Sequence, residues 1–240
     1  MNKILSLDEA LKDLHDGMSV MIGGFAGVGV PLKCIEKIVE KGVKDLTLIT
    51  VVNSNPFANG KFDLAPLFVN KQIKKVIAAH NGTCPEAVEQ HRTGELEVEF
   101  SPMGTWIERI RAAGAGLGAV VTPTGIGTLV EEGKQKITID GREYLVELPL
   151  RADFAFIKGR RADALGNVEY AGVSRNSNQV IATAADYVVA EVDEIVNVGD
   201  IDPERVGTPC VFVNGVVQGY TYAEHQKLLS DLWIKGGAIK

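Results

Sequence analysis

The stretch DGMSVMIGGFAGVGVP, residues 16–31, places the apolar run at 19–22 directly before a loop that contains four glycines. Pro31 then suits the first turn of a helix, because its missing N–H group needs no partner there. The next apolar run, at 46–52, is rich in β-branched residues and indicates a second strand. Strand, loop, helix and strand together predict a parallel, right-handed βαβ unit.

The same alternation continues along the chain and predicts the rest of the fold. Further strands are expected at 73–79, 96–100, 152–159 and 185–192, and helices at 6–17, 31–42, 85–94, 104–116 and 222–233. A hairpin with an Asp140-Gly141 turn indicates a small antiparallel flap at about 119–150. We expect an α/β fold with an open, mostly parallel sheet and helices on both faces, formed by residues 1–240 as a single domain.

Composition and charge narrow the class of protein. The 240 residues are 45% hydrophobic and carry a formal net charge of -6, with lysines and arginines scattered rather than gathered on one face. A nucleic-acid partner is therefore not expected. The N-terminus lacks the apolar core of a secretion signal, and no apolar run approaches the roughly 20 residues of a membrane span. We expect a cytoplasmic protein without a membrane partner.

The scattered cysteines and histidines do not indicate a metal site or a disulfide framework. Cys34, Cys84 and Cys210 are far apart, which fits a reducing compartment. His80 and Cys84 lack a second pair of ligands at a metal-binding spacing. His225 is expected on the surface of a helix, and the cations of 157–163 in a solvated turn, with the nucleotide end of a ligand as the second option.

Two interpretations of the glycine loop, Gly23 to Gly29, remain open. Helix and sheet can crowd together there, or the missing β-carbons can let a ligand approach the backbone. The loop matches neither the dinucleotide-binding G-x-G-x-x-G pattern nor the P-loop, so neither nicotinamide nor nucleotide phosphate is expected. Backbone N–H groups at the start of the Pro31 helix can still receive an anion or a developing oxyanion.

The spacing of this stretch resembles a family signature. Asp16-Gly17, Val20-Met21-Ile22, Gly23-Gly24-Phe25, Gly29 and Pro31 are similar to the signature of the alpha subunit, or N-terminal half, of the 3-oxoacid CoA-transferases. The segments 95–134, 148–159 and 164–170 resemble the same family, and the similarity runs to about Val196. The resemblance implies a CoA-transferase fold.

The resemblance also implies a chemistry. Family members move coenzyme A between short-chain carboxylic acids such as acetate and acetoacetate, through an acyl–glutamyl anhydride and a glutamyl thioester. Coenzyme A is then a substrate, and no permanently bound cofactor or metal is expected. The residues that the resemblance assigns to CoA binding are Gly23, Gly24, Phe25, Ala26, Gly27, Val28 and Gly29.

The nucleophilic glutamate of the family lies in a Ser-Glu-Asn-Gly context on the beta subunit, and this tetrapeptide is absent here. We therefore assign no catalytic residue to this chain and expect an obligatory beta partner, in a heterodimer or a heterotetramer. The chain's own glutamates are interpreted as solvated or surface charges: Glu95, Glu97, Glu99, Glu131, Glu132 and Glu191.

The substrate-pocket candidates are Asn53, Met103, Gly104, Thr124 and Gly125. In relatives the Pro-x-Gly-Thr turn commonly holds a glutamine whose amide is proposed to stabilise the oxyanion, whereas this chain has Met103. A thioether cannot donate a hydrogen bond. Either another donor replaces the amide, or Met103 lines an apolar acyl pocket. Asn53 follows a strand at the carboxyl edge of the sheet, where either a ligand contact or a turn is expected.

Two other functions remain as alternatives. A sugar-phosphate isomerase of the same broad fold requires a catalytic acid and a basic phosphate pocket in this one chain, and neither is evident. A noncatalytic CoA- or metabolite-binding module predicts ligand binding without a partner. A fold alone does not choose among them, because one scaffold hosts several chemistries.

Overall fold

A parallel sheet forms the centre of the molecule, as predicted. The computed structural model describes residues 2–237. The main sheet has nine strands in the order β11-β9-β8-β1-β2-β3-β4, with β10 pairing with β8 and β12. The strands are β1 Ser19–Ile22, β2 Leu46–Ile49, β3 Ile73–Ala78, β4 Glu97–Phe100, β8 Ala152–Asp163, β9 Val168–Glu169, β10 Ala185–Val196, β11 Val206–Thr208 and β12 Gly215–Gln218. Only the pairs that involve β9 are antiparallel.

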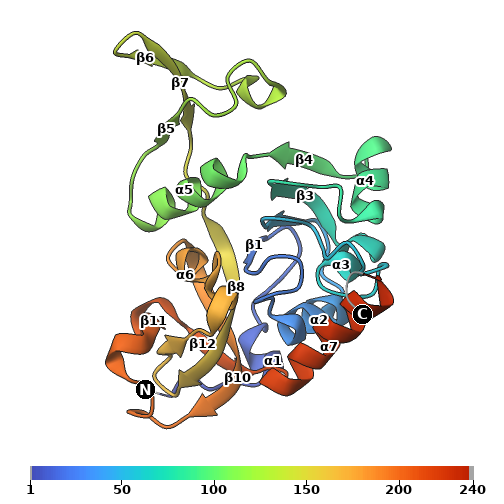
Figure 1. Ribbon diagram of the computed structural model, residues 1–240, viewed down its shortest axis with the longest axis vertical. Coiled ribbons are helices and arrows are strands. Elements are labelled where there is room, and N and C mark those ends of the chain that lie inside the picture. Colours follow the sequence, from blue (N-terminus) through green and yellow to red (C-terminus); the bar gives the residue numbers. More distant parts are fainter. Residues whose placement is uncertain (1, 238–240) are drawn as a thin grey trace.

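Helices cover both faces of this sheet (Figure 1). They are α1 Leu7–Ala10, α2 Leu32–Lys41, α3 Ala65–Val69, α4 Pro85–Arg92, α5 Met103–Gly114, α6 Asn178–Ile181 and α7 Tyr222–Lys235. One buried apolar cluster contains residues of α1 to α4, and a second contains residues of α5 and α6. The two clusters lie on opposite faces because successive side chains of each strand alternate between them.

Local signals explain the ends of α1 and α2. Gly42 ends α2 in the left-handed conformation at φ +69°, as its position predicts. Ser6 and Glu9 form the expected capping box at the start of α1. The predicted extent of that helix, 6–17, is wrong, since α1 ends at Ala10. The chain turns there and still buries Leu11 and Leu14 in the core, so tertiary packing overrides the helical pattern.

The flap is a separate three-stranded antiparallel sheet, in the order β5-β7-β6. Its strands are β5 Val120–Thr122, β6 Lys136–Ile139 and β7 Arg142–Glu147. Asp140 and Gly141 turn the predicted hairpin with φ of +50° and +76°. Figure 1 shows the flap projecting beyond α5, away from the main sheet.

Within residues 2–237, no helix is long and apolar enough to cross a membrane.

Candidate functional site

The tip of the glycine loop is a tight two-residue turn. Phe25 and Val28 exchange two backbone hydrogen bonds, with N···O distances of 2.9 and 3.0 Å. Ala26 and Gly27 between them have φ of +49° and +90°. Two successive positive φ angles are typical of a type I′ turn, which favours glycine. The turn projects from the carboxyl end of β1, the edge where open α/β sheets bind ligands.

Side chains hold the backbone of this turn from several directions. Four successive carbonyl oxygens each accept a side-chain hydrogen bond: Ala26 from Asn55 Nδ2 at 2.7 Å, Gly27 from His225 Nε2 at 3.2 Å, Val28 from Asn176 Nδ2 at 3.0 Å and Gly29 from Asn178 Nδ2 at 2.9 Å. Because the carbonyl groups are fixed, the intervening N–H groups are fixed as well.

Among the described residues, several N–H groups of residues 23–30 have no hydrogen-bond partner, namely those of Gly24, Ala26, Gly29 and Val30. The first turn of α5 starts close by at Met103, and no side chain caps it. Preorganised N–H donors of this kind stabilise an oxygen that gains negative charge. The loop therefore has the chemical capacity of an oxyanion site.

Crowding within the chain, the first of the two interpretations, explains the four glycines. A β-carbon at Gly23 would collide with the side chain of Asn178, and one at Gly29 would lie 2.7 Å from the carbonyl oxygen of Ser174. The positions at Gly24 and Gly27 are filled by Val30 and Leu229. The bare faces of the glycines thus accommodate this chain's own atoms. The structure thus favours the crowding interpretation, and binding of coenzyme A to the loop stays a prediction.

A cavity of about 250 Å³ opens beside the tip of the loop. We call it the Phe25 cavity; it is lined by Gly24, Phe25, Val51, Met103, Trp106, Ile107, Asn176 and Ser177. Phe25 and Met103 are 45% and 52% exposed, so their side chains face the opening. The cavity brings together residues of the predicted CoA loop and the predicted pocket residue Met103.

The other pocket candidates lie elsewhere. Asn53 is fully buried, and its amide donates to Oδ1 of Asn81. Gly104 is exposed in the first turn of α5. Thr124 and Gly125 belong to the flap, where a β-carbon at Gly125 would lie 2.8 Å from the Val130 side chain. None of these four lines the Phe25 cavity within this chain, so their assignment to the substrate pocket stays a prediction.

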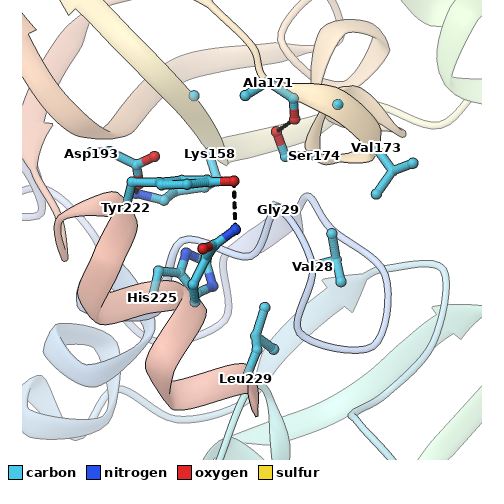
Figure 2. A pocket seen from close by; sticks show the side chains of 13 residues that line it. Val28, Gly29, Lys158, Ala171, Val173, Ser174, Asp193, Tyr222, His225 and Leu229 are labelled. Atoms are coloured by element: carbon cyan, nitrogen blue, oxygen red, sulfur yellow. Dashed lines mark hydrogen bonds and ion pairs between the residues drawn. The ribbon is translucent and has the colours of Figure 1, made fainter.

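A second cavity, of about 270 Å³, lies between α7 and the Val28–Gly29 part of the loop (Figure 2). We call it the α7 cavity; its lining includes Val28, Lys158, Asp193, Tyr222, His225 and Leu229. His225 is buried rather than on the surface as expected, because α7 packs this face against the loop. Burial lowers the pKa of its imidazole, and the nearby Lys158 charge lowers it further. The ring is therefore neutral when it donates to Gly27.

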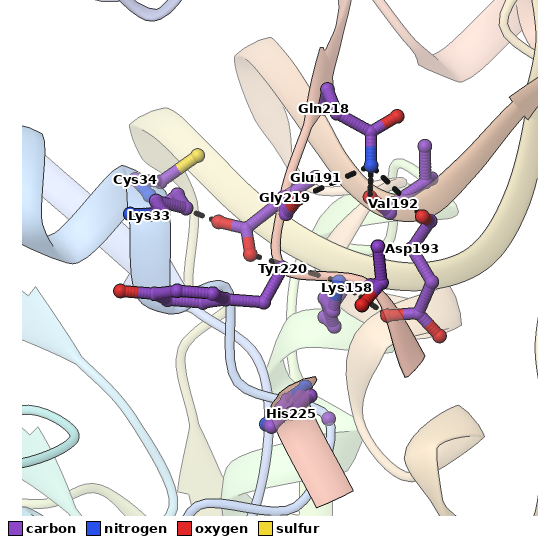
Figure 3. Close-up of polar contacts among 12 residues, drawn as sticks. Lys33, Cys34, Lys158, Glu191, Val192, Asp193, Gln218, Gly219, Tyr220 and His225 are labelled. Carbon is purple, nitrogen blue, oxygen red and sulfur yellow. Dashed lines mark hydrogen bonds and ion pairs between the residues drawn. The ribbon is translucent and has the colours of Figure 1, made fainter. Parts of the chain in front are cut away.

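A buried charge cluster lies between the α7 cavity and α2 (Figure 3). Glu191 is fully buried, and its Oε2 accepts the backbone N–H of Cys34 at 2.9 Å. Lys158 Nζ lies 2.7 Å from Asp193 Oδ1 and 3.7 Å from Glu191 Oε1. The 2.7 Å contact is an ion pair whose angles fall outside hydrogen-bond geometry.

This cluster corrects two expectations from the sequence. Glu191 is not a surface charge, since β10 lies between β8 and β12 in the sheet. Residues 157–163 are not a solvated turn either, because β8 extends through them to Asp163 and buries Lys158. The anion at the start of α2 is Glu191 of this chain. Burial raises the pKa of Glu191, and Lys158 opposes that rise.

The glutamates of the β4 region behave mostly as expected. Glu95 and Glu97 are exposed, but Glu99 is half-buried and pairs with the buried Arg109 at 2.9 Å. Burial raises the pKa of Glu99, but the hydrogen bonds and charges of Arg109 and Lys75 together outweigh it, so the net pKa is lowered. Glu99 is therefore a structural residue that forms an ion pair with Arg109. Among residues 2–237, no three His, Cys, Asp or Glu side chains are placed to hold a metal ion.

Comparison with known proteins places this geometry in a family. The family model described as coenzyme A transferase matches residues 4–219. The chain belongs to the coenzyme A transferase family. It is 46% identical to the acetate CoA-transferase subunit alpha of Escherichia coli K12 over 215 residues, which cover 90% of this chain and 96% of that subunit.

Other coenzyme A transferases are similar to this chain in sequence or in fold. The acetoacetyl-CoA:acetate/butyrate CoA transferase alpha subunit of Clostridium acetobutylicum is 43% identical over 217 residues, covering 90% of this chain and 98% of that one. Among solved structures, an acyl-CoA transferase of E. coli O157:H7, determined as a thioester complex with CoA, superposes with a TM-score of 0.81 at 22% identity. This chain is covered to 90% but spans only 47% of that longer chain.

Proposed function

We propose that this chain is the alpha subunit of an enzyme that moves coenzyme A between a short-chain acyl-CoA and a carboxylic acid. The nucleophile is a glutamate of the beta subunit, in a Ser-Glu-Asn-Gly segment. Its carboxylate attacks the thioester carbonyl, CoA leaves as the thiolate, and an acyl–glutamyl anhydride remains. The thiolate then attacks the glutamyl carbonyl, releases the first acid, and leaves a glutamyl thioester for the second acid.

The single observation that carries this proposal is the fixed glycine loop with free donors. Each attack generates a tetrahedral oxyanion, and rigid N–H groups lower the energy of that state more than they lower that of the substrate. Gly24, which lines the Phe25 cavity together with Met103, offers such a donor, while the carbonyl groups of residues 25–29 all accept hydrogen bonds. A backbone N–H donor also replaces the side-chain amide that relatives commonly have at the position of Met103.

Among the described residues, neither cavity beside the loop is lined by an unpaired carboxylate, which supports the division of labour between two chains. No acidic residue lines the Phe25 cavity within the described chain. Asp193, the acidic residue that lines the α7 cavity, is paired with Lys158, and Arg160 lies 3.3 Å from its second oxygen. A nucleophilic carboxylate needs an unshared oxygen in reach of the thioester, so we assign that role to the partner.

Reconstitution tests the proposal. Purified alpha chain, beta chain that carries Ser-Glu-Asn-Gly, and their mixture are incubated with an acyl-CoA and a second acid, and formation of the new acyl-CoA is followed by chromatography. We expect transfer only in the mixture, and none when the glutamate of that beta segment is replaced by glutamine. Transfer by the alpha chain alone contradicts the proposal.

A further inference from the structure

The walls of the Phe25 cavity are apolar. Five of its eight lining residues are large and apolar: Phe25, Val51, Met103, Trp106 and Ile107. Gly24 has no side chain and contributes only its backbone. Met103 stands at the first position of α5, where its flexible thioether lies at the opening. An unbranched, polarizable side chain adapts to apolar groups of different shape. The site where relatives commonly hold a polar amide is therefore an apolar wall here.

The two polar residues of the lining are already engaged. Asn176 donates to the carbonyl of Val28 at 3.0 Å, and its Oδ1 accepts from the backbone N–H of Ser177 at 2.6 Å. The hydroxyl of Ser177 lies 3.3 Å from the same Oδ1. No lysine, arginine or histidine of the described chain lines the cavity. A ligand in the cavity therefore meets mainly apolar surface and no cation.

We propose that the Phe25 cavity selects an apolar, uncharged acyl chain, of the butanoyl or 3-methylbutanoyl class, over acetyl and over dicarboxylic acyl groups. This inference rests on the proposed function. The thioester oxygen lies toward the free N–H groups of the loop, and the hydrocarbon part of the acyl group packs between Phe25, Met103 and Ile107. Methyl branches increase the buried apolar surface, which favours binding.

A second carboxylate is unfavourable in this cavity for the same reason. A carboxylate that leaves water needs a cation or several hydrogen-bond donors, and its desolvation costs several kcal/mol without them. A succinyl group would bring such a carboxylate against the side chains of Met103 and Ile107. The apolar walls thus reject dicarboxylic acyl groups while they admit a branched hydrocarbon.

The test compares acyl donors in the reconstituted complex. Values of kcat/KM are measured for butanoyl-, 3-methylbutanoyl-, acetyl- and succinyl-CoA with propanoate as the common acceptor. We expect both apolar donors to exceed acetyl-CoA by about 10-fold or more, the lower end for added methylenes in an apolar pocket. Succinyl-CoA should fall below butanoyl-CoA by about 100-fold or more, because its distal carboxylate is unpaired.

Two variants connect the preference to the cavity. Met103→Gln and Ile107→Thr each should reduce the ratio of butanoyl to acetyl kcat/KM by about 10-fold, through lost apolar contact. Ile139→Thr, an exposed position on the flap at 45% exposure, is the matched control and should leave the ratio unchanged. Because Met103 is half-exposed, its replacement should not unfold the chain.

The outcomes separate the two proposals. Transfer that favours acetyl- or succinyl-CoA, or a ratio that neither variant alters, overturns the acyl selectivity and leaves the proposed function standing. Absence of transfer with all four donors overturns the proposed function, and the selectivity with it.

Discussion

Glu191 accepts the backbone N–H of Cys34 at 2.9 Å, so a fully buried carboxylate of β10 joins the first turn of α2 directly behind the glycine loop. A negative charge at this end of a helix is favourable, because the unpaired N–H groups carry partial positive charge. Lys158 balances the charge from the neighbouring strand. The anion position at this helix is thus occupied from within the fold.

Replacement of Glu191 by alanine should destabilise the chain by about 3–5 kcal/mol, the range for breaking a buried ion pair. Lys158 loses one of its two carboxylate neighbours, and the Cys34 N–H loses its acceptor. Glu194→Ala on the same strand removes an exposed carboxylate and should change stability by less than about 0.5 kcal/mol. Urea unfolding of both variants measures the difference, and equal stabilities would refute the role of Glu191.

Asp63 should make stability depend on pH. The residue is only 4% exposed, and burial raises its pKa from 3.8 to about 7. Hydrogen bonds from the backbone N–H groups of Asn55, Leu64 and Gly27 lower the pKa but do not outweigh the burial. A raised pKa means that the folded state holds the proton more tightly. The protonated carboxyl group therefore makes its full contribution to the free energy of unfolding below pH 3.8. This contribution, at most roughly 4 kcal/mol, is lost as the pH rises to about 7.

Asp63→Asn tests this dependence, since its amide cannot ionise. The free energy of unfolding of the variant minus that of the wild type should increase between pH 4 and pH 7 and then level off. Asp45→Asn is the matched control, because Asp45 has the same φ of +58° but is exposed. A difference for Asp63→Asn that stays constant over this pH range would disprove the prediction.

Gly23→Ala should destabilise the chain by about 1–3 kcal/mol, the usual cost of overpacking. The added methyl group displaces the Asn178 side chain. Its Oδ1 accepts from the backbone N–H of Lys158 at 3.0 Å, and its Nδ2 donates to the carbonyl oxygen of Gly29 at 2.9 Å. Both substitutions disturb the same contact. The double variant Gly23→Ala/Asn178→Ala should therefore lose less stability than the two single variants lose together. Gly118→Ala, with open space around it, serves as control. Additive losses would argue against the contact.

His225→Ala should loosen the glycine loop. The variant removes the hydrogen bond to Gly27 O, and a bond worth about 1 kcal/mol corresponds to roughly fivefold faster opening. Amide hydrogen exchange of the peptide that spans residues 24–30 measures this change. Lys227→Ala, on the exposed side of the same helix, should leave the exchange as it is. Equal exchange in both variants would show that α7 does not restrain the loop.

The sequence predicts the βαβ core because its signals are local. Gly42 and the Asp140-Gly141 turn act through the backbone of their own segments and lie where the sequence predicts them, while Pro31 stands at the N-cap, one residue before the predicted first turn. The sequence does not predict the short elements α3, α6, β9, β11 and β12, whose segments carry no clear hydrophobic periodicity. One of them matters for the site, because α6 carries Asn178.

The buried groups of the site were not predictable for another reason. Glu191 and His225 look polar and solvated in sequence, and their burial depends on β12 and α7 packing from far along the chain. Met103 was recognised through the family pattern, and its cavity neighbours Val51 and Asn176 come from segments that only the tertiary fold brings together. Distant contacts of this kind leave no periodic signal in the sequence.

The most direct test of the central claim is the location of the covalent intermediate. The reconstituted complex is incubated with acyl-CoA alone, quenched, and both chains are weighed by intact mass spectrometry. We predict that the mass of one coenzyme A, less water, is added to the beta chain and that this alpha chain stays unmodified. A coenzyme A adduct on this chain would contradict the account.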